Sequence, residues 1–204
     1  MSVQQVQNVT IRDILLQRER VIFIEGEITD MLASHVCEQL QYLNNESVEK
    51  PITLMISSPG GSVVAGCRIL DRIDTMIKAP IIGVADGLVA SMASVIFAHC
   101  GKRIVMPNAD IMLHQASSGA QGNIQDMRIS LAWTEKKNRR LLEYLANDTK
   151  HTYDEMVAFT SRDYWLDAEE AVKFGIADEI YSNKKTESES SKSKETKLYF
   201  AGNN

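Results

Sequence analysis

Cysteine is scarce in this 204-residue sequence, and the three cysteines present are poorly placed to crosslink the chain. Cys37, Cys67 and Cys100 are widely spaced and form no C-x-x-C motif. A disulfide framework or a zinc site needs paired or clustered cysteines, and the isolated pair His99-Cys100 falls far short of one. The cysteines therefore predict neither a disulfide scaffold nor a metal site, and they indicate inert thiols in the reducing cytoplasm.

A signal peptide and a membrane-spanning run are also missing. The first residues show no basic segment followed by an apolar one. Residues 81–100 come nearest to a membrane span, but Asp86, two glycines and two serines interrupt them. A buried strand, turn and helix explains this stretch better, so the sequence predicts no membrane association.

An excess of positive charge is absent as well, since the formal net charge is −5 at pH 7. No basic stripe with interleaved aromatic residues occurs, so the sequence predicts no binding to nucleic acid. A hydrophobic content of 44% over this length suffices for one full core. Residues 182–196, rich in Ser, Lys and Glu, bury too little apolar surface to fold. We expect one domain over 1–181, beginning with an N-terminal segment over 1–17, and a disordered tail over 182–204.

Short strands and helices alternate along the sequence. Apolar runs predict strands at 21–25, 52–56, 81–85, 104–106 and 111–114. Amphipathic or apolar segments of helical length predict helices starting at 29 or 30, at 63–77, from 91 and at 123–147. This alternation is typical of an α/β fold.

Ser91 lies where a predicted strand meets a predicted helix, in the sequence GLVASMA. The first N–H groups of a helix have no partner within it, so the Met92 N–H can point at an oxyanion beside the serine. Gly60 or Gly61, in a Ser-Pro-Gly-Gly turn, can supply a second donor because glycine allows close backbone approach. These are parts of an acyl-transfer enzyme. The structural alternatives are a helix N-cap and an ordinary turn.

Of the four histidines, only His114 suits a catalytic base. His99 lies on the predicted helix of Ser91 but about 12 Å along it. His35 belongs to the flank of an amphipathic helix, and His151 to a polar connection. His114 ends a predicted strand just before a loop, where catalytic residues are common. A structural histidine held by hydrogen bonds is the alternative.

Asp163 is the candidate for a third, orienting group. It lies between two predicted helices that have capping residues of their own, so it is free for another role. Asp110, on the strand of His114 itself, is about 13 Å away and too distant to orient that imidazole. A local ion pair between Asp163 and Arg162 is the alternative.

These residues occur within motifs that resemble the ClpP family, the peptidase subunits of the Clp protease. The resemblance covers about residues 18–180. The motifs, in the family's order, are Ser-Pro-Gly-Gly at 58–61, Ala-Ser-Met at 90–92, Gly-Lys-Arg at 101–103 followed by Met-Pro-Asn at 106–108, Met-Leu-His-Gln at 112–115, and Arg-Asp at 162–163 before Ala-Glu-Glu-Ala at 168–171.

The resemblance implies roles for named residues. It implies Ser91 as nucleophile, His114 as general base and Asp163 as the orienting acid. Gly61 and Met92 would form the oxyanion hole. The implied fold is the ClpP/crotonase-type spiral of β-β-α units, with the helix at 123–147 projecting as a handle that packs against an opposing ring.

The implied activity is that of a serine endopeptidase, which hydrolyses unfolded proteins and short peptides through an acyl-enzyme. The family forms two stacked heptameric rings, and a Clp AAA+ ATPase feeds chains into the chamber. Residues 1–17 would then lie in the axial region. No metal or organic cofactor is implied, and the sequence has no P-loop, so ATP would be used only by the partner.

Several departures from the family pattern keep alternatives open. Ala93 replaces a common glycine and is predicted to narrow the pocket beside the nucleophile, and Ala116 replaces a usual proline and is predicted to loosen the loop after the base. Ser161 replaces a commonly acidic residue, which counts against an inter-ring contact there. Thr53 and Met55 replace aromatic residues at the surface that receives the ATPase. One alternative is a weakly active or non-catalytic ring subunit that needs another ClpP in a mixed ring. A crotonase-like acyl-CoA enzyme of the same fold is the other.

Overall fold

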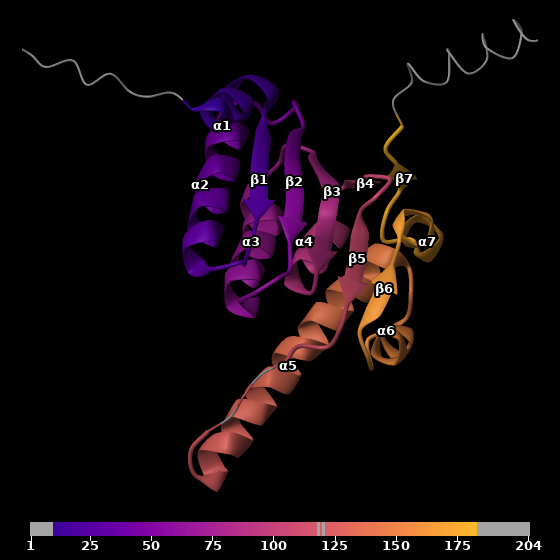
Figure 1. Ribbon diagram of the computed structural model, residues 1–204. Coiled ribbons are helices and arrows are strands. Elements are labelled where there is room, and N and C mark those ends of the chain that lie inside the picture. The colour runs from indigo at the N-terminus through magenta and orange to yellow at the C-terminus, as the bar shows by residue number, and fades with distance from the viewer. Residues whose placement is uncertain (1–9, 118, 120, 183–204) are drawn as a thin grey trace, which may run out of the picture.

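The structure is a computed structural model that describes residues 10–117, 119 and 121–182 (Figure 1). The predicted tail, apart from residue 182, and the first nine residues of the predicted N-terminal segment lie outside the described residues. The rest of that segment forms a short helix, α1 (Ile11–Ile14), and part of a π-helical turn, η1 (Leu15–Glu19). Within the described part of the chain, no helix is long and apolar enough to cross a membrane.

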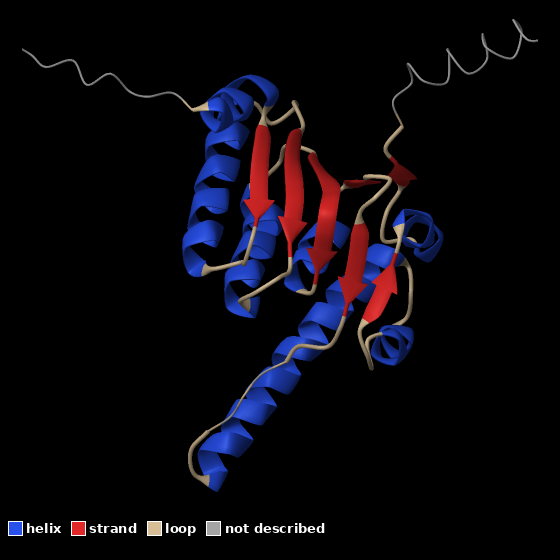
Figure 2. Cartoon of the chain, in the orientation of Figure 1, coloured by secondary structure: helices blue, strands red, loops and turns tan. Residues whose placement is uncertain are grey.

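A mostly parallel sheet lies at the centre of the described chain (Figure 2). Its main path follows the order β1-β2-β3-β4-β7 with every neighbouring pair parallel. Strand β5 pairs in parallel with β3 and antiparallel with β6. The strands are β1 (Val21–Glu25), β2 (Ile52–Ser58), β3 (Ile81–Ala90), β4 (Lys102–Val105), β5 (Asp110–Leu113), β6 (Tyr164–Leu166) and β7 (Glu179–Ile180). The predicted α/β class is confirmed.

Helices pack against this sheet and against one another, as the apolar stripes of the sequence predict. Alternate residues of β2, among them Ile52, Leu54 and Ile56, are fully buried and contribute to the core. The remaining helices are α2 (Asp30–Glu46), α3 (Val63–Met76), α4 (Met92–Ala98), α5 (Ile124–Thr149), α6 (Tyr153–Phe159) and α7 (Ala168–Phe174).

Helix α5 projects away from the sheet, as Figures 1 and 2 show. Asn123 caps its first turn through hydrogen bonds from the N–H groups of Gln125 and Asp126. Its buried residues all lie between Leu141 and Thr149, so the last part of the helix packs most closely on the rest of the described chain. The predicted long helix is therefore confirmed, with bounds that differ by one or two residues.

Strand β3 is longer than the predicted strand at 81–85 because it changes partner. Its first half pairs with β4 up to Ala85, and its second half pairs with β5 from Leu88 onward. The exposed residues between these halves include Gly87 at φ +73°, which interrupts the apolar pattern without ending the strand. The extension carries the chain to Ser91 beside the end of β5.

Candidate active site

Ser91 lies at the junction of β3 and α4 with an unusual backbone conformation. Its φ of 57° and ψ of −124° are rare for a residue other than glycine and are costly to hold. A hydrogen bond from the Ser91 N–H to the Met112 carbonyl, 2.9 Å, ties this junction to β5. The hydroxyl makes no capping bond to α4, which removes the N-cap explanation for this serine.

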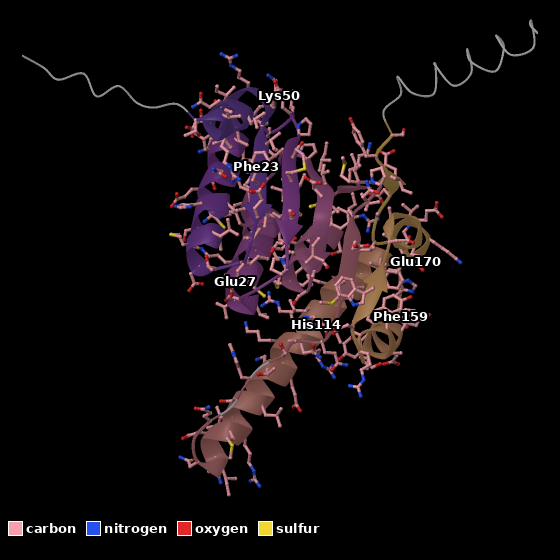
Figure 3. All side chains as sticks on the ribbon, viewed as in Figure 1. Phe23, Glu27, Lys50, His114, Phe159 and Glu170 are labelled. Atoms are coloured by element: carbon pink, nitrogen blue, oxygen red, sulfur yellow. The ribbon has the colours of Figure 1, made fainter. Side chains whose placement is uncertain are left out.

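The hydroxyl of Ser91 instead meets His114. The two atoms Ser91 Oγ and His114 Nε2 are 2.7 Å apart, a short hydrogen-bond distance. His114 directly follows β5, whose Met112 lies beside Ala90 of β3, so the parallel pairing brings serine and histidine together. His114, labelled in Figure 3, lines one pocket together with Leu141 and Leu142 of α5.

Asp163 faces the other nitrogen of His114, at a longer distance. Its Oδ1 lies 3.7 Å from Nδ1, beyond a direct hydrogen bond, and its side chain is 63% exposed. Strand β6, which is not among the strands that the sequence predicts, explains the proximity because its Tyr164 pairs with Leu113 next to the histidine. Within the described residues, Asp163 forms no ion pair with Arg162, so the local alternative has no support.

The glycine turn packs directly on Ser91. A Cβ at Gly60 would lie 2.6 Å from the Ser91 Cβ, so only glycine fits this close approach. The Gly60 N–H is already used, since it donates to Ser58 Oγ at 3.1 Å. Sequence reasoning assigned no role to Ser58, although a serine two residues before a glycine can form such a turn.

The N–H groups of Gly61 and Met92 have no acceptor among the described residues. Ile28 hydrogen-bonds to the residues on either side of Gly61, which is the parallel-bridge pattern and turns the Gly61 N–H away from Ile28. The Met92 N–H is the first of α4, a group that a helix leaves without an internal partner. Of the two glycines considered, Gly61 is therefore the one with a donor to offer.

A small pocket of about 50 Å³ opens beside Ser91. Its lining is largely apolar and comes from the start of α3, from α4, from the end of β5 and from α5; it includes Val63, Val95, Leu113, Leu141, Leu142 and Leu145. Ala93 is not among the residues that line this pocket, and its side chain is fully buried in the core. The predicted narrowing of the pocket by Ala93 is therefore wrong.

Ala116, predicted to loosen the loop after His114, has one restraint of its own. The Ala116 N–H donates to Asn138 Oδ1 on α5 at 2.9 Å. A proline at this position has no N–H and could not form this bond. The bond therefore supplies part of the restraint that a proline would give.

The other three histidines lie elsewhere, as the sequence predicts. His35 is exposed on α2, and His151 contacts the carbonyl of Phe174. His99 contacts two carboxylates far along α4 from the serine. Across the described residues, no group of three or more His, Cys, Asp or Glu side chains could hold a metal ion.

Comparison with known families agrees with the motifs. The family model described as Clp protease matches residues 3–184, which is most of the chain and includes every residue of the site.

Proposed function

Because the chain belongs to the Clp protease family, we propose that this ClpP-type peptidase is a serine endopeptidase that cleaves peptide bonds through an acyl-enzyme. The observation that carries the proposal is the 2.7 Å contact between Ser91 Oγ and His114 Nε2 at a strained strand-to-helix junction. A serine hydroxyl within hydrogen-bond reach of an imidazole is the arrangement that activates a nucleophile.

In the proposed reaction, His114 Nε2 accepts the hydroxyl proton as Ser91 Oγ attacks the substrate carbonyl carbon. The carbonyl oxygen becomes an oxyanion, and the free N–H groups of Gly61 and Met92 hydrogen-bond to it. His114 then gives the proton to the leaving amine, and the acyl group remains on Ser91. Water repeats the same steps, with His114 as base, and frees the acid product.

Asp163 would orient the imidazole through Nδ1 and stabilise its protonated form. The 3.7 Å separation and the exposure of Asp163 favour a second candidate function, that of a subunit that is weakly active on its own. Assembly with copies of itself or with another ClpP would then bring the Asp163 carboxylate within hydrogen-bond distance of His114.

The surroundings of the site suggest what binds there. The apolar lining of the pocket fits an apolar side chain next to the cleaved bond. Membership of the family implies oligomeric assembly in general, and we propose two stacked heptameric rings served by a Clp AAA+ ATPase. Exposed apolar residues on the projecting part of α5 support a subunit contact there, namely Ile124, Ile129, Leu131 and Trp133.

A fluorophosphonate probe followed by intact-mass measurement tests the proposal without a guess at the substrate. The wild-type chain should gain one probe mass, and Ser91→Ala should gain none while keeping its fold and assembly. Ser117→Ala is the matched control, because Ser117 is exposed at the same pocket, whereas the hydroxyl bonded to His114 among the described residues is that of Ser91. Labelling that persists in Ser91→Ala, or peptide hydrolysis undiminished by it, would contradict the assignment.

A further inference from the structure

The pocket beside Ser91 has two walls that come from distant parts of the sequence. One wall is the loop that follows His114, including Ala116, and the other is the last part of α5. Among the described residues, a hydrogen bond from the Ala116 N–H to Asn138 Oδ1 joins them at 2.9 Å. Both residues are half-buried, so the bond is partly shielded from competing water.

The position of Asn138 on α5 relates this bond to the pocket. Leu141, Leu142 and Leu145 follow it by three, four and seven residues, so all four side chains lie on one face of the helix. The three leucines line the pocket. Asn138 therefore holds the loop over the same helical face that the substrate side chain would contact.

We propose that Asn138 is a positioning residue, which fixes the loop after His114 against α5 and thereby sets the shape of the substrate pocket. The inference rests on the proposed peptidase function and adds a determinant of substrate binding to it. Asn138 contacts neither Ser91 nor His114 in any hydrogen bond of the described residues. Its loss should therefore weaken substrate binding more than it slows the chemical step.

Substitutions on both sides of the bond test the inference. Asn138→Ala removes the acceptor, Asn138→Asp keeps one, and Ala116→Pro removes the donor. With a short peptide that has an apolar residue at the cleavage site, Asn138→Ala should raise KM by about five- to tenfold with kcat changed less than about twofold. Asn138→Asp should recover most of the loss. Asn147→Ala, an exposed asparagine on the same helix, is the matched control and should leave KM unchanged.

The double variant Asn138→Ala/Ala116→Pro measures the coupling. If the bond carries the effect, Asn138→Ala should add nothing once Ala116 is proline. Independent losses that multiply, an unchanged KM in Asn138→Ala, or no recovery in Asn138→Asp would each overturn the inference.

Hydrogen exchange at the Ala116 amide gives a readout that needs no activity. Measured by mass spectrometry on a peptide that contains residue 116, this amide should exchange faster in Asn138→Ala than in wild type or in Asn147→Ala. Unchanged exchange would overturn the inference even in an active enzyme. If the wild type cleaves no peptide but the Ala116 amide exchanges faster in Asn138→Ala, the proposed function is contradicted. The inference that Asn138 holds the loop would still stand.

Discussion

Two histidines of this chain each have a carboxylate on the side of Nδ1 and differ in the group at Nε2. His99, at the end of α4, has a carboxylate on each ring nitrogen: Asp74 Oδ1 lies 2.7 Å from Nε2, and Asp148 Oδ2 lies 2.9 Å from Nδ1. His114 has a hydroxyl, that of Ser91, at its Nε2. Two neighbouring carboxylates favour the cationic form of a histidine, whereas a histidine beside a hydroxyl can take up the proton of that hydroxyl.

The difference extends to the groups around each ring. The hydrogen bond to Asp148, above all, and then that to Asp74 raise the pKa of His99 against the opposing effect of burial. The cluster connects α3, α4 and α5, since Tyr144 on α5 also donates to Asp74, and burial together with that carboxylate raises the pKa of Tyr144 to about 12. Polar contacts alone therefore do not identify an active site; the identity of the partner atoms does.

The comparison is tested most directly by the same substitution at both histidines. His114→Asn should lower kcat/KM by about 10⁴-fold or more and abolish fluorophosphonate labelling, because no base remains to take the serine proton. His99→Asn should keep the labelling, since it has no contact with the nucleophile.

Circular dichroism and sedimentation velocity control for lost fold or assembly in both variants. Equal loss of labelling in folded, assembled samples of both proteins would break the distinction between the two sites.

Asp163 beside His114 and Asp148 beside His99 should also differ in their effect on kcat/KM. Asp163→Asn should lower kcat/KM by about 10²- to 10⁴-fold, because the imidazole loses its orienting partner. We place the effect below that of His114→Asn because the Asp163 carboxylate is 3.7 Å from the ring and largely exposed. Asp148→Asn should leave kcat/KM near the wild-type value and lower stability instead. Kinetics on assembled protein that show no loss for Asp163→Asn would reduce the site to a dyad of Ser91 and His114.

The sequence predicted the serine and histidine because each depends on local pattern. A strand that ends in a helix places Ser91, and a strand that ends in a loop places His114. The approach of Asp163 depends on β6, three residues that form a strand only by pairing with β5, and so no local signal reveals it. The hydrogen bond from Ala116 to Asn138 also has no local signal in the sequence, because it joins two segments that are distant in sequence and meet only in the folded chain.

The stability that the surroundings of His99 contribute should depend on pH. The pKa of folded His99 lies above its ordinary value of 6.5, so its stabilising contribution is complete below about pH 6.5 and is lost as pH rises through the raised pKa. When His99 loses its proton, one ring nitrogen presents a lone pair to a carboxylate oxygen, and that hydrogen bond is lost. The free energy of unfolding in urea should therefore fall by about 1–3 kcal/mol across that range.

His99→Gln should remove most of this pH dependence, whereas His114→Gln should retain it. The contrary result is an unfolding free energy of the wild type that stays constant as pH rises above 6.5 at fixed protein concentration. It would show that His99 binds its proton no more tightly in the folded state than in the unfolded state.

The smallest expected effect lies next to Asp148 and has the opposite sign with pH. Arg103 donates to the Asp148 carbonyl and pairs with Asp178, and the hydrogen bond from its side chain lowers the pKa of Asp178 below the ordinary 3.8. That contribution is present above about pH 3.8 and is lost as pH falls through the lowered pKa. Because the Asp178 side chain is 39% exposed, solvent screens the pair, and Asp178→Asn should cost only about 0.5–1 kcal/mol at neutral pH.

Urea unfolding at pH 7 and pH 3 measures the loss of stability in Asp178→Asn. Glu179→Gln is the control, because Glu179 pairs with an exposed lysine. A cost for Asp178→Asn that is larger at pH 3 than at pH 7 would mean that the carboxylate acts as a neutral hydrogen-bond partner there and would remove the ion pair from the account.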